Sequence, residues 1–140
     1  NGFQTTNGKG LRGIYITKAG KYVFDNVTVV NVTYAINVNT TQAVELTVKN
    51  STLQGWTSYG TSTTASFENV KFTCGKYANF KPYSEVTLTG CDFADGFQLD
   101  VTSLASGKIY LNNCTYKGVA ISAANMPAID GDASKVVIVM

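Results

Sequence analysis

The sequence predicts an all-β solenoid, in which short strands wind into stacked parallel coils. The first observation is a repeat, because the segment VKNSTLQGW at 48–56 returns with substitutions along the chain. The second is the alternation of apolar and polar residues within each copy. The third is the scarcity of helical patterns, since no apolar i, i+3, i+4, i+7 stripe exceeds one turn. The related segments are FDNVTVVNV (24–32), FENVKFTCG (67–75), LTGCDFADG (88–96) and LNNCTYKGV (111–119).

One position of the repeat holds Asn or Gly in every copy. Successive copies of this position lie 24, 19, 21 and 23 residues apart. Asn and Gly tolerate the left-handed backbone conformation that a sharp corner needs. We therefore expect a structural ladder at one corner of the stack, with side-chain amides bonded along it. Its members are Asn26, Asn50, Asn69, Gly90 and Asn113.

The unit at 44–63 shows how one coil is built. Apolar and polar residues alternate over 44–48, so this strand has one apolar face. A second short strand covers 51–53, Gly55 opens another corner, and a third strand covers 56–59. The pattern predicts about five short coils of three strands each. The residues of the later units that we expect to face the core are Val86, Leu88, Cys91, Phe93, Phe97, Leu99, Val101, Ile109, Leu111, Cys114, Tyr116, Val119 and Ile121.

The length predicts one domain over 1–140. Residues 1–20 are expected to form an N-terminal cap and partial coil, since 12–20 has the pattern of a third strand. Residues 21–122 are expected to form the repeated coils. Residues 123–140 are expected to form a C-terminal cap or a docking strand, because the apolar run at 135–140 has no polar residue after it.

A β-sandwich would also contain many short strands, but it would not keep one corner residue in phase through five copies. The repeat plan and the Asn corner resemble the right-handed parallel β-helix superfamily of pectate lyases, viral tailspikes and bacterial surface adhesins. The resemblance covers residues 11–122 and includes no catalytic motif. It implies a single-stranded right-handed parallel β-helix of the non-catalytic surface or viral-fibre type, and parallel crossovers are generally right-handed.

Composition argues against several function classes. A net charge of +2, with one arginine and scattered lysines, shows no clustered basic patch for nucleic acid. No run of 18 apolar residues is present, so no membrane-spanning helix is expected. The chain has no histidine, which removes Ser-His-Asp and Cys-His nucleophilic sites. No phosphate-binding glycine loop occurs. We expect no enzyme activity and no cofactor.

Carboxylates remain as candidate catalytic residues, since glycosidases use them in pairs. Asp25, Lys49 and Glu68 fall in one predicted column, and this alternation is typical of solvated surface ladders. Asp92 and Asp95, with Asp100 near, form the one acidic cluster worth testing. The Asp-Gly-Asp segment at 130–132 is more typical of a turn than of a calcium site. We therefore expect no metal site.

Three cysteines are present. Cys91 and Cys114 both follow the corner position, so they are expected to lie stacked in the core on adjacent coils. Stacked parallel geometry is often poor for a disulfide, which favours two buried thiols over an oxidised pair. Cys74 lies near the opposite corner, and an odd cysteine is no sign of a disulfide scaffold.

The third strands of two successive coils read WTSY at 56–59 and YANF at 77–80. Alternation cannot bury both aromatic residues of an aromatic-x-x-aromatic pair on one face. At least one ring of each pair should therefore face outward beside its neighbour, where it could stack on a sugar. The candidate ligand-binding residues are Trp56, Tyr59, Tyr77, Asn79, Lys81 and Tyr83. Core packing or loop capping is the alternative role for these rings.

The function expected is a non-catalytic extracellular or cell-surface module, a spacer or an adhesive domain that binds a glycan or a surface protein. A virion or appendage fibre subunit that oligomerises is the second hypothesis, since uncapped coil ends favour assembly. A polysaccharide lyase or glycoside hydrolase is the third. Partners therefore include a glycan, a surface protein, further copies or a larger parent protein joined through the terminal coils.

Overall fold

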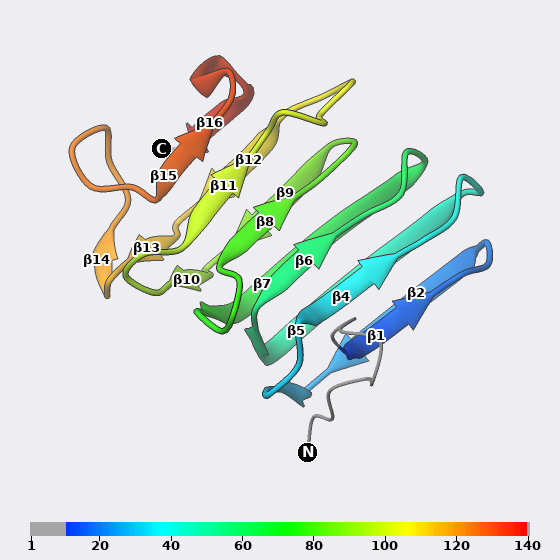
Figure 1. Ribbon diagram of the computed structural model, residues 1–140. Helices are drawn as coiled ribbons and strands as arrows, with labels where there is room; N and C mark the ends of the chain where they lie inside the picture. Colours follow the sequence, from blue (N-terminus) through cyan, green and yellow to red (C-terminus); the bar gives the residue numbers. More distant parts are fainter. Residues whose placement is uncertain (1–10, 140) are drawn as a thin grey trace.

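The computed structural model describes residues 11–139 and shows a β-solenoid of about five turns, as predicted. Figure 1 shows the coils side by side in chain order, from the N-terminal coil in blue to the C-terminal coil in red. Successive coils pair through parallel strands, which form one six-stranded and one ten-stranded sheet. No helix among residues 11–139 is long and apolar enough to cross a membrane.

The six-stranded sheet contains the third strand of each coil. In spatial order it consists of β1 (Arg12–Ile16), β4 (Tyr34–Val38), β6 (Trp56–Ser58), β8 (Asn79–Lys81), β11 (Gln98–Asp100) and β15 (Ala128–Asp130). All of its pairings are parallel. The segment at 12–16 joins this sheet as its first strand, so the described chain enters the solenoid part-way round, as its sequence pattern predicts.

The ten-stranded sheet contains the other strands and bends at the Asn/Gly corner. Its members are β2 (Gly20–Asp25), β3 (Thr28–Val29), β5 (Val44–Gln54), β7 (Thr63–Thr73), β9 (Val86–Thr89), β10 (Asp92–Phe93), β12 (Ile109–Asn112), β13 (Thr115–Tyr116), β14 (Val119–Ala120) and β16 (Val136–Val139). A short 3₁₀ helix, η1 (Ala133–Lys135), precedes β16. In β5 and β7 the chain continues through the corner, so each long strand includes two of the predicted short strands.

The predicted corner positions have a left-handed backbone at every copy. Their φ angles lie between 49° and 61°. Side chains also connect neighbouring coils: Asn69 Nδ2 donates to Asn50 Oδ1 at 2.9 Å, and Asn50 Nδ2 donates to Asp25 Oδ1 at 3.0 Å. The ladder therefore joins side chain to side chain, and one of its members is the aspartate that precedes the first corner. The corner residues are Asn26, Asn50, Asn69, Gly90 and Asn113.

The core is a continuous apolar filling between the two sheets. Six aromatic rings occupy its centre, and Phe72 and Phe93 stack with their centroids 5.1 Å apart and their planes 12° from parallel. Like residues of successive coils thus form columns along the stack, as the strand alternation predicts. The aromatic core consists of Tyr59, Phe67, Phe72, Phe80, Phe93 and Phe97.

Charged residues on the outer face of the ten-stranded sheet follow the predicted columns. Asp25 pairs in register with Lys49, and Lys49 with Glu68. The Lys49 Nζ and Glu68 Oε2 atoms lie 3.7 Å apart, and the two side chains are 43% and 60% exposed. Such a pair contributes little to the free energy of unfolding.

The last coil departs from the prediction. The chain turns at Lys117 and Gly118, whose φ angles are 56° and 74°, so β14 returns antiparallel to β13. Val119, expected to face the core, is instead 60% exposed at this edge. Two consecutive positive φ values are typical of a type I′ hairpin turn, which the prediction of a core-facing Val119 did not include.

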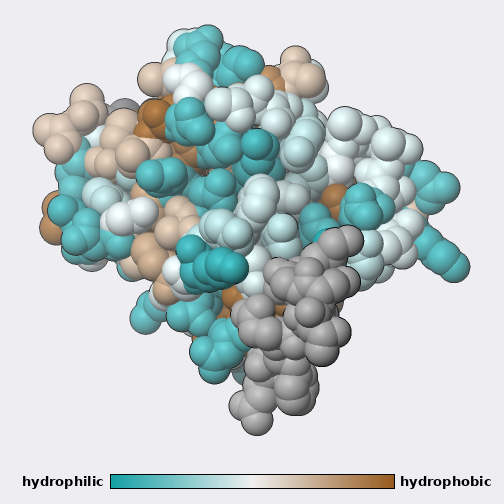
Figure 2. Space-filling model, in the orientation of Figure 1, coloured by the Kyte–Doolittle hydropathy of each residue, from teal (hydrophilic) through white to brown (hydrophobic). Residues whose placement is uncertain are grey.

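Of the two ends of the solenoid, the structure describes the C-terminal one in full up to residue 139. The expected N-terminal cap falls largely on residues 1–10, which lie outside the described residues. At the other end, β16 pairs in parallel with β12 and adds a last strand to the ten-stranded sheet. Val139 on this strand is 41% exposed. In Figure 2, hydrophobic patches are visible over this C-terminal part of the molecule.

Candidate functional site

Three aromatic side chains form a row along the outer face of the six-stranded sheet, two from β4 and β6 and one from the loop before β8. Tyr34 and Trp56 are paired in register, and their ring centroids lie 4.9 Å apart. The rings of Trp56 and Tyr77 meet edge to face at 5.6 Å. Tyr34 and Trp56 are half-buried, and Tyr77 is 41% exposed. The three residues, which we call the aromatic row, span three successive coils.

A cationic side chain lies at each end of the aromatic row. The Arg12 guanidinium carbon lies 5.2 Å from the Tyr34 ring centroid and 4.8 Å from that of Tyr15. The Lys76 ammonium lies 5.7 Å from the Tyr77 centroid. Neither cation forms an ion pair with a carboxylate among residues 11–139. The rings are thus held partly by cation–π contacts.

Hydrogen-bonded side chains run beside the aromatic row. Arg12 Nε donates to Asn37 Oδ1 at 2.9 Å, and Asn37 Nδ2 donates to Ser58 Oγ at 3.1 Å. Asn39 Nδ2 donates to the Tyr15 hydroxyl at 2.9 Å. These bonds link neighbouring coils, so they fix the positions of amides and hydroxyls on the outer face of the sheet.

The structure places the sequence-predicted site residues in two environments. Trp56 and Tyr77 contact one another on the outer face, whereas Tyr59 is a core residue with 2% exposure. Burial of the Tyr59 ring does not support the prediction that it is exposed to a ligand beside Trp56. Strand alternation explains the difference, since Tyr59 lies three residues after the outward Trp56 and so faces inward.

The two polar residues predicted beside the rings are already engaged or covered. Lys81 forms an ion pair with Asp100, with 3.3 Å between Nζ and Oδ2, and this pair is largely shielded from solvent. Asn79 is half-buried, and its Oδ1 atom is covered and has no hydrogen-bond partner among the described residues. Asn79 and Lys81 thus offer few free groups to a ligand.

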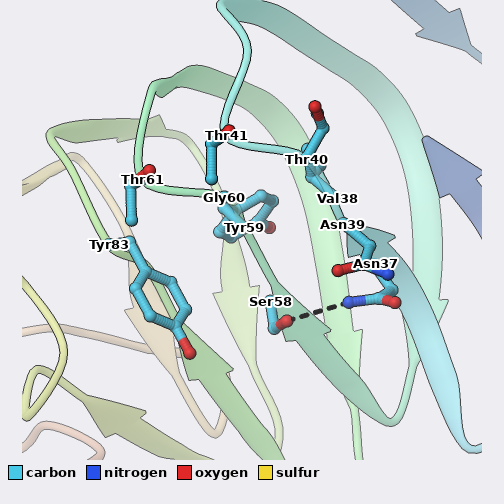
Figure 3. Close-up of a pocket in the computed structure, with 10 residues that line it drawn as sticks. All are labelled: Asn37, Val38, Asn39, Thr40, Thr41, Ser58, Tyr59, Gly60, Thr61 and Tyr83. Atoms are coloured by element: carbon cyan, nitrogen blue, oxygen red, sulfur yellow. Dashed lines mark hydrogen bonds between the residues drawn. The ribbon is translucent and has the colours of Figure 1, made fainter. Parts of the chain in front are cut away.

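A hollow of about 470 Å³ opens beside the aromatic row, near the ends of β4 and β6. Tyr83 stands on one side of it, Asn37 on the other, and Ser58 between them (Figure 3). We call it the Tyr83 hollow. Its lining residues carry hydroxyl, amide and aromatic groups and no charged side chain. They are Asn37, Val38, Asn39, Thr40, Thr41, Ser58, Tyr59, Gly60, Thr61 and Tyr83.

The hollow has no acid–base pair for catalysis. Its titratable groups are the hydroxyls of Tyr59 and Tyr83. Burial raises the pKa of Tyr59 well above the ordinary value for a tyrosine. Tyr59 therefore stays neutral and cannot act as a general base at ordinary pH. The groups that line the Tyr83 hollow can donate and accept hydrogen bonds, and its rings offer apolar area. These are properties of a binding surface.

The acidic cluster singled out from the sequence has a structural role. Asp92 accepts hydrogen bonds from the Thr115 hydroxyl and from the Gly118 N–H, the latter at 3.2 Å. The Asp95 Oδ1 atom lies 3.9 Å from the Lys117 Nζ atom. Both carboxylates thus hold the β13–β14 hairpin, and Asp100 is paired with Lys81 on the other sheet. Residues 11–139 contain no group of three or more His, Cys, Asp or Glu placed to hold a metal ion.

The cysteines lie where the corner register puts them. Cys91 and Cys114 are buried on adjacent coils as free thiols. The neighbouring Cys114 thiol, together with burial, raises the pKa of Cys91. Cys74 is a half-buried free thiol at the other corner, and its Sγ donates to the Asp95 carbonyl oxygen at 3.2 Å.

Sequence reasoning missed Tyr34 as a member of the aromatic row. A signal was present, because Tyr34 follows its corner Asn26 by eight residues, and Tyr77 follows Asn69 by the same number. Asn37, Asn39 and Ser58 had no comparable signal, since only the fold brings them to one hollow. Comparison with known proteins gives no further guide: no family model, curated protein or solved structure matches this chain.

Proposed function

We propose that this protein is a non-catalytic binding module of an exported or surface-displayed protein, and that it binds a glycan on the outer face of its six-stranded sheet. The observation that carries the proposal is the aromatic row Tyr34–Trp56–Tyr77, in which three partly exposed rings lie on successive coils. Aromatic rings offer large apolar area at little cost in side-chain entropy, which suits the apolar faces of pyranose rings.

The surroundings of the row support a glycan over an apolar partner. Side-chain amides and hydroxyls lie next to the rings, already oriented by hydrogen bonds between coils. The face drawn in Figure 2 is hydrophilic to near-neutral over most of its area, apart from the patches named above. A sugar needs this combination of ring faces and fixed polar groups, because it presents apolar faces rimmed by hydroxyls.

A binding function also agrees with the chemistry of the candidate residues. The carboxylates considered for glycosidase chemistry serve the hairpin at Asp92 and Asp95 and the ion pair at Asp100. None of the three lines the Tyr83 hollow. A lyase or hydrolase would need an acid and a base positioned about a bound sugar.

The test is a glycan array followed by titration of tryptophan fluorescence, since Trp56 is the only indole in the chain. We expect one or more glycans to shift the Trp56 emission, and we expect Tyr77→Ala to abolish the shift while the protein stays folded. Tyr110→Ala, on β12 of the other sheet, is the matched control and should bind as the wild type does. Equal binding by the two variants would contradict the proposal.

A second candidate function is a subunit of a fibre or appendage. The observation that favours it is β16, a short apolar last strand that pairs on one side with β12 and has no second partner among the described residues. Strand edges of this kind can pair with another chain. Light scattering that gives a stable trimer or polymer would support this function, and a monomer at all concentrations would exclude it.

A further inference from the structure

The Tyr83 hollow lies on the same face as the aromatic row but is separate from it. Ser58 follows Trp56 by two residues on β6, so the hollow begins about 7 Å along the strand direction from the row. Asn37 holds the corresponding place on β4, and its amide donates to Ser58 Oγ at 3.1 Å. One ligand of disaccharide size or more could therefore contact both places.

The shape of the hollow is fixed by close packing of two loops. A Cβ atom added at Gly60 would lie 2.1 Å from the Thr40 carbonyl oxygen, so only glycine allows this approach. Tyr59 lies beneath with its hydroxyl buried and without a hydrogen-bond partner among the described residues. A preformed hollow loses little conformational entropy on binding.

The polar groups of the hollow are neutral and retain hydrogen-bonding capacity. The Ser58 hydroxyl accepts from Asn37 and can still donate its own proton. The hydroxyl of Thr40 accepts from the Gln42 N–H at 3.1 Å and can likewise donate. Tyr83 is half-buried and adds a ring at the rim. A ligand with several hydroxyls matches these groups, whereas a charged ligand would meet no charged side chain in the lining, since Arg12 bonds to Asn37 but does not itself line the hollow.

We infer that the Tyr83 hollow is a second subsite that takes one uncharged sugar unit of a glycan bound along the aromatic row. This inference rests on the proposed function, because the row anchors the ligand. The volume of about 470 Å³ falls in the range of small-ligand pockets. The ligand class is thus an oligosaccharide long enough to extend from the row into the hollow, with an uncharged unit at that end.

Oligosaccharide length gives the test. Neutral cello-, manno- and malto-oligosaccharides, from disaccharide to hexasaccharide, are titrated against the protein with Trp56 emission as the readout. For the series that binds, we expect affinity to rise about tenfold or more with length, as the second subsite becomes filled. Oligogalacturonates of equal length, which place a carboxylate in the hollow, should show no such rise.

Two variants separate the hollow from the row. Thr41→Phe places a ring in the hollow from an exposed loop position. We expect this variant to lose the rise in affinity with oligosaccharide length, while it still binds the disaccharide. Tyr83→Ala should reduce the gain in the same way. Thr64→Phe, at an exposed position of β7 on the other sheet, is the control and should keep the gain.

The outcomes distinguish the two proposals. Binding that is independent of length, or a gain that Thr41→Phe leaves intact, would overturn the second subsite and leave the proposed function standing. An equal gain with oligogalacturonates would overturn the assignment of an uncharged unit. Failure of every glycan on the array to bind would overturn the proposed function and this inference with it.

Discussion

Single residues set the corners of this solenoid. Asn69 and Asn50 have φ angles of 53° and 49°, in the left-handed region that Asn tolerates better than most residues. Their amides form a bonded chain that ends on Asp25, although all three side chains are exposed. The Asn50 and Asn69 corners thus combine a left-handed backbone with a side-chain contact between coils, whereas Gly90 meets the backbone requirement alone.

We expect Asn69→Leu to lower the free energy of unfolding by about 1–2 kcal/mol, from left-handed strain and the lost hydrogen bond together. Lys71→Ala, an exposed change on the same strand, should cost less than about 0.5 kcal/mol. The denaturant midpoints of the two variants measure these changes in the free energy of unfolding. Asn69→Gly keeps the backbone conformation and so isolates the hydrogen bond. If the Leu variant were as stable as the Lys71 variant, the corner ladder would have no energetic role.

The ion pair between Lys81 and Asp100 ties β8 to β11 on the outer face. Burial alone would raise the pKa of Asp100, but hydrogen bonds from Thr102 and the charge of Lys81 outweigh it and lower this pKa. The contribution to stability is therefore complete above the unfolded-state pKa of an aspartate. It is lost as the pH falls through the lower pKa of the folded state.

Asp100→Asn should therefore lower the free energy of unfolding at neutral pH by about 1–3 kcal/mol, the cost of breaking a shielded charged contact. The difference from wild type should shrink as the pH falls toward the folded-state pKa of Asp100. Urea denaturation at several pH values measures this. Asp130→Asn is the control, since Asp130 is the exposed register partner of Asp100 on β15. A destabilisation that stays constant with pH would contradict the ionic origin.

At the scale of elements, the register between neighbouring strands determines which side chains face the core. Asp92 pairs with Thr115, so the preceding residues Cys91 and Cys114 occupy the same place on adjacent coils. Their Sγ atoms donate to carbonyl oxygens of the neighbouring coil, Cys91 to Phe67 at 3.6 Å and Cys114 to Leu88 at 3.3 Å. The thiols thus behave as small core residues.

Labelling with a thiol reagent tests this placement. In the native protein we expect Cys74 alone to react. Its reaction should be slow at neutral pH, because burial and the charge of Asp95 raise its pKa and the thiolate is the reactive form. Cys91 and Cys114 should react only after unfolding. Mass spectrometry of digested protein identifies the labelled sites. Fast native labelling of Cys114 would show that the β13 register is wrong.

For the whole molecule, the sequence predicted what repeats and missed what occurs once. The strand alternation and the Asn corner recur in each coil, so the solenoid, its columns and an outward ring in each aromatic pair could be predicted. The β13–β14 hairpin and the Tyr83 hollow occur once and depend on contacts between distant loops. The burial of Tyr59 was not predicted, because the alternation left open which ring of each aromatic pair faces outward.

The stacked architecture also predicts how stability is distributed. Each coil contacts only its neighbours, so the central coils should open last and the terminal strand first. Phe93 is fully buried and packs against Phe72 and Phe97 of the central core. Val136, on the last strand, is half-buried and pairs on one side with Ile109 of β12.

We therefore expect Phe93→Ala to lower the free energy of unfolding by about 3–5 kcal/mol, the usual cost of removing a buried ring. Hydrogen exchange should then quicken in the central strands, because their amides exchange only when the unit that opens last has opened. Val136→Ala should quicken exchange in β16 and its neighbour β12, while the exchange rates in β5 and β7 stay at their wild-type values. Amide exchange followed by mass spectrometry resolves the two patterns. Faster exchange of β5 and β7 in the Val136 variant would show that the terminal strand is part of one cooperative unit with the centre, and the nearest-neighbour view of this solenoid would then be wrong.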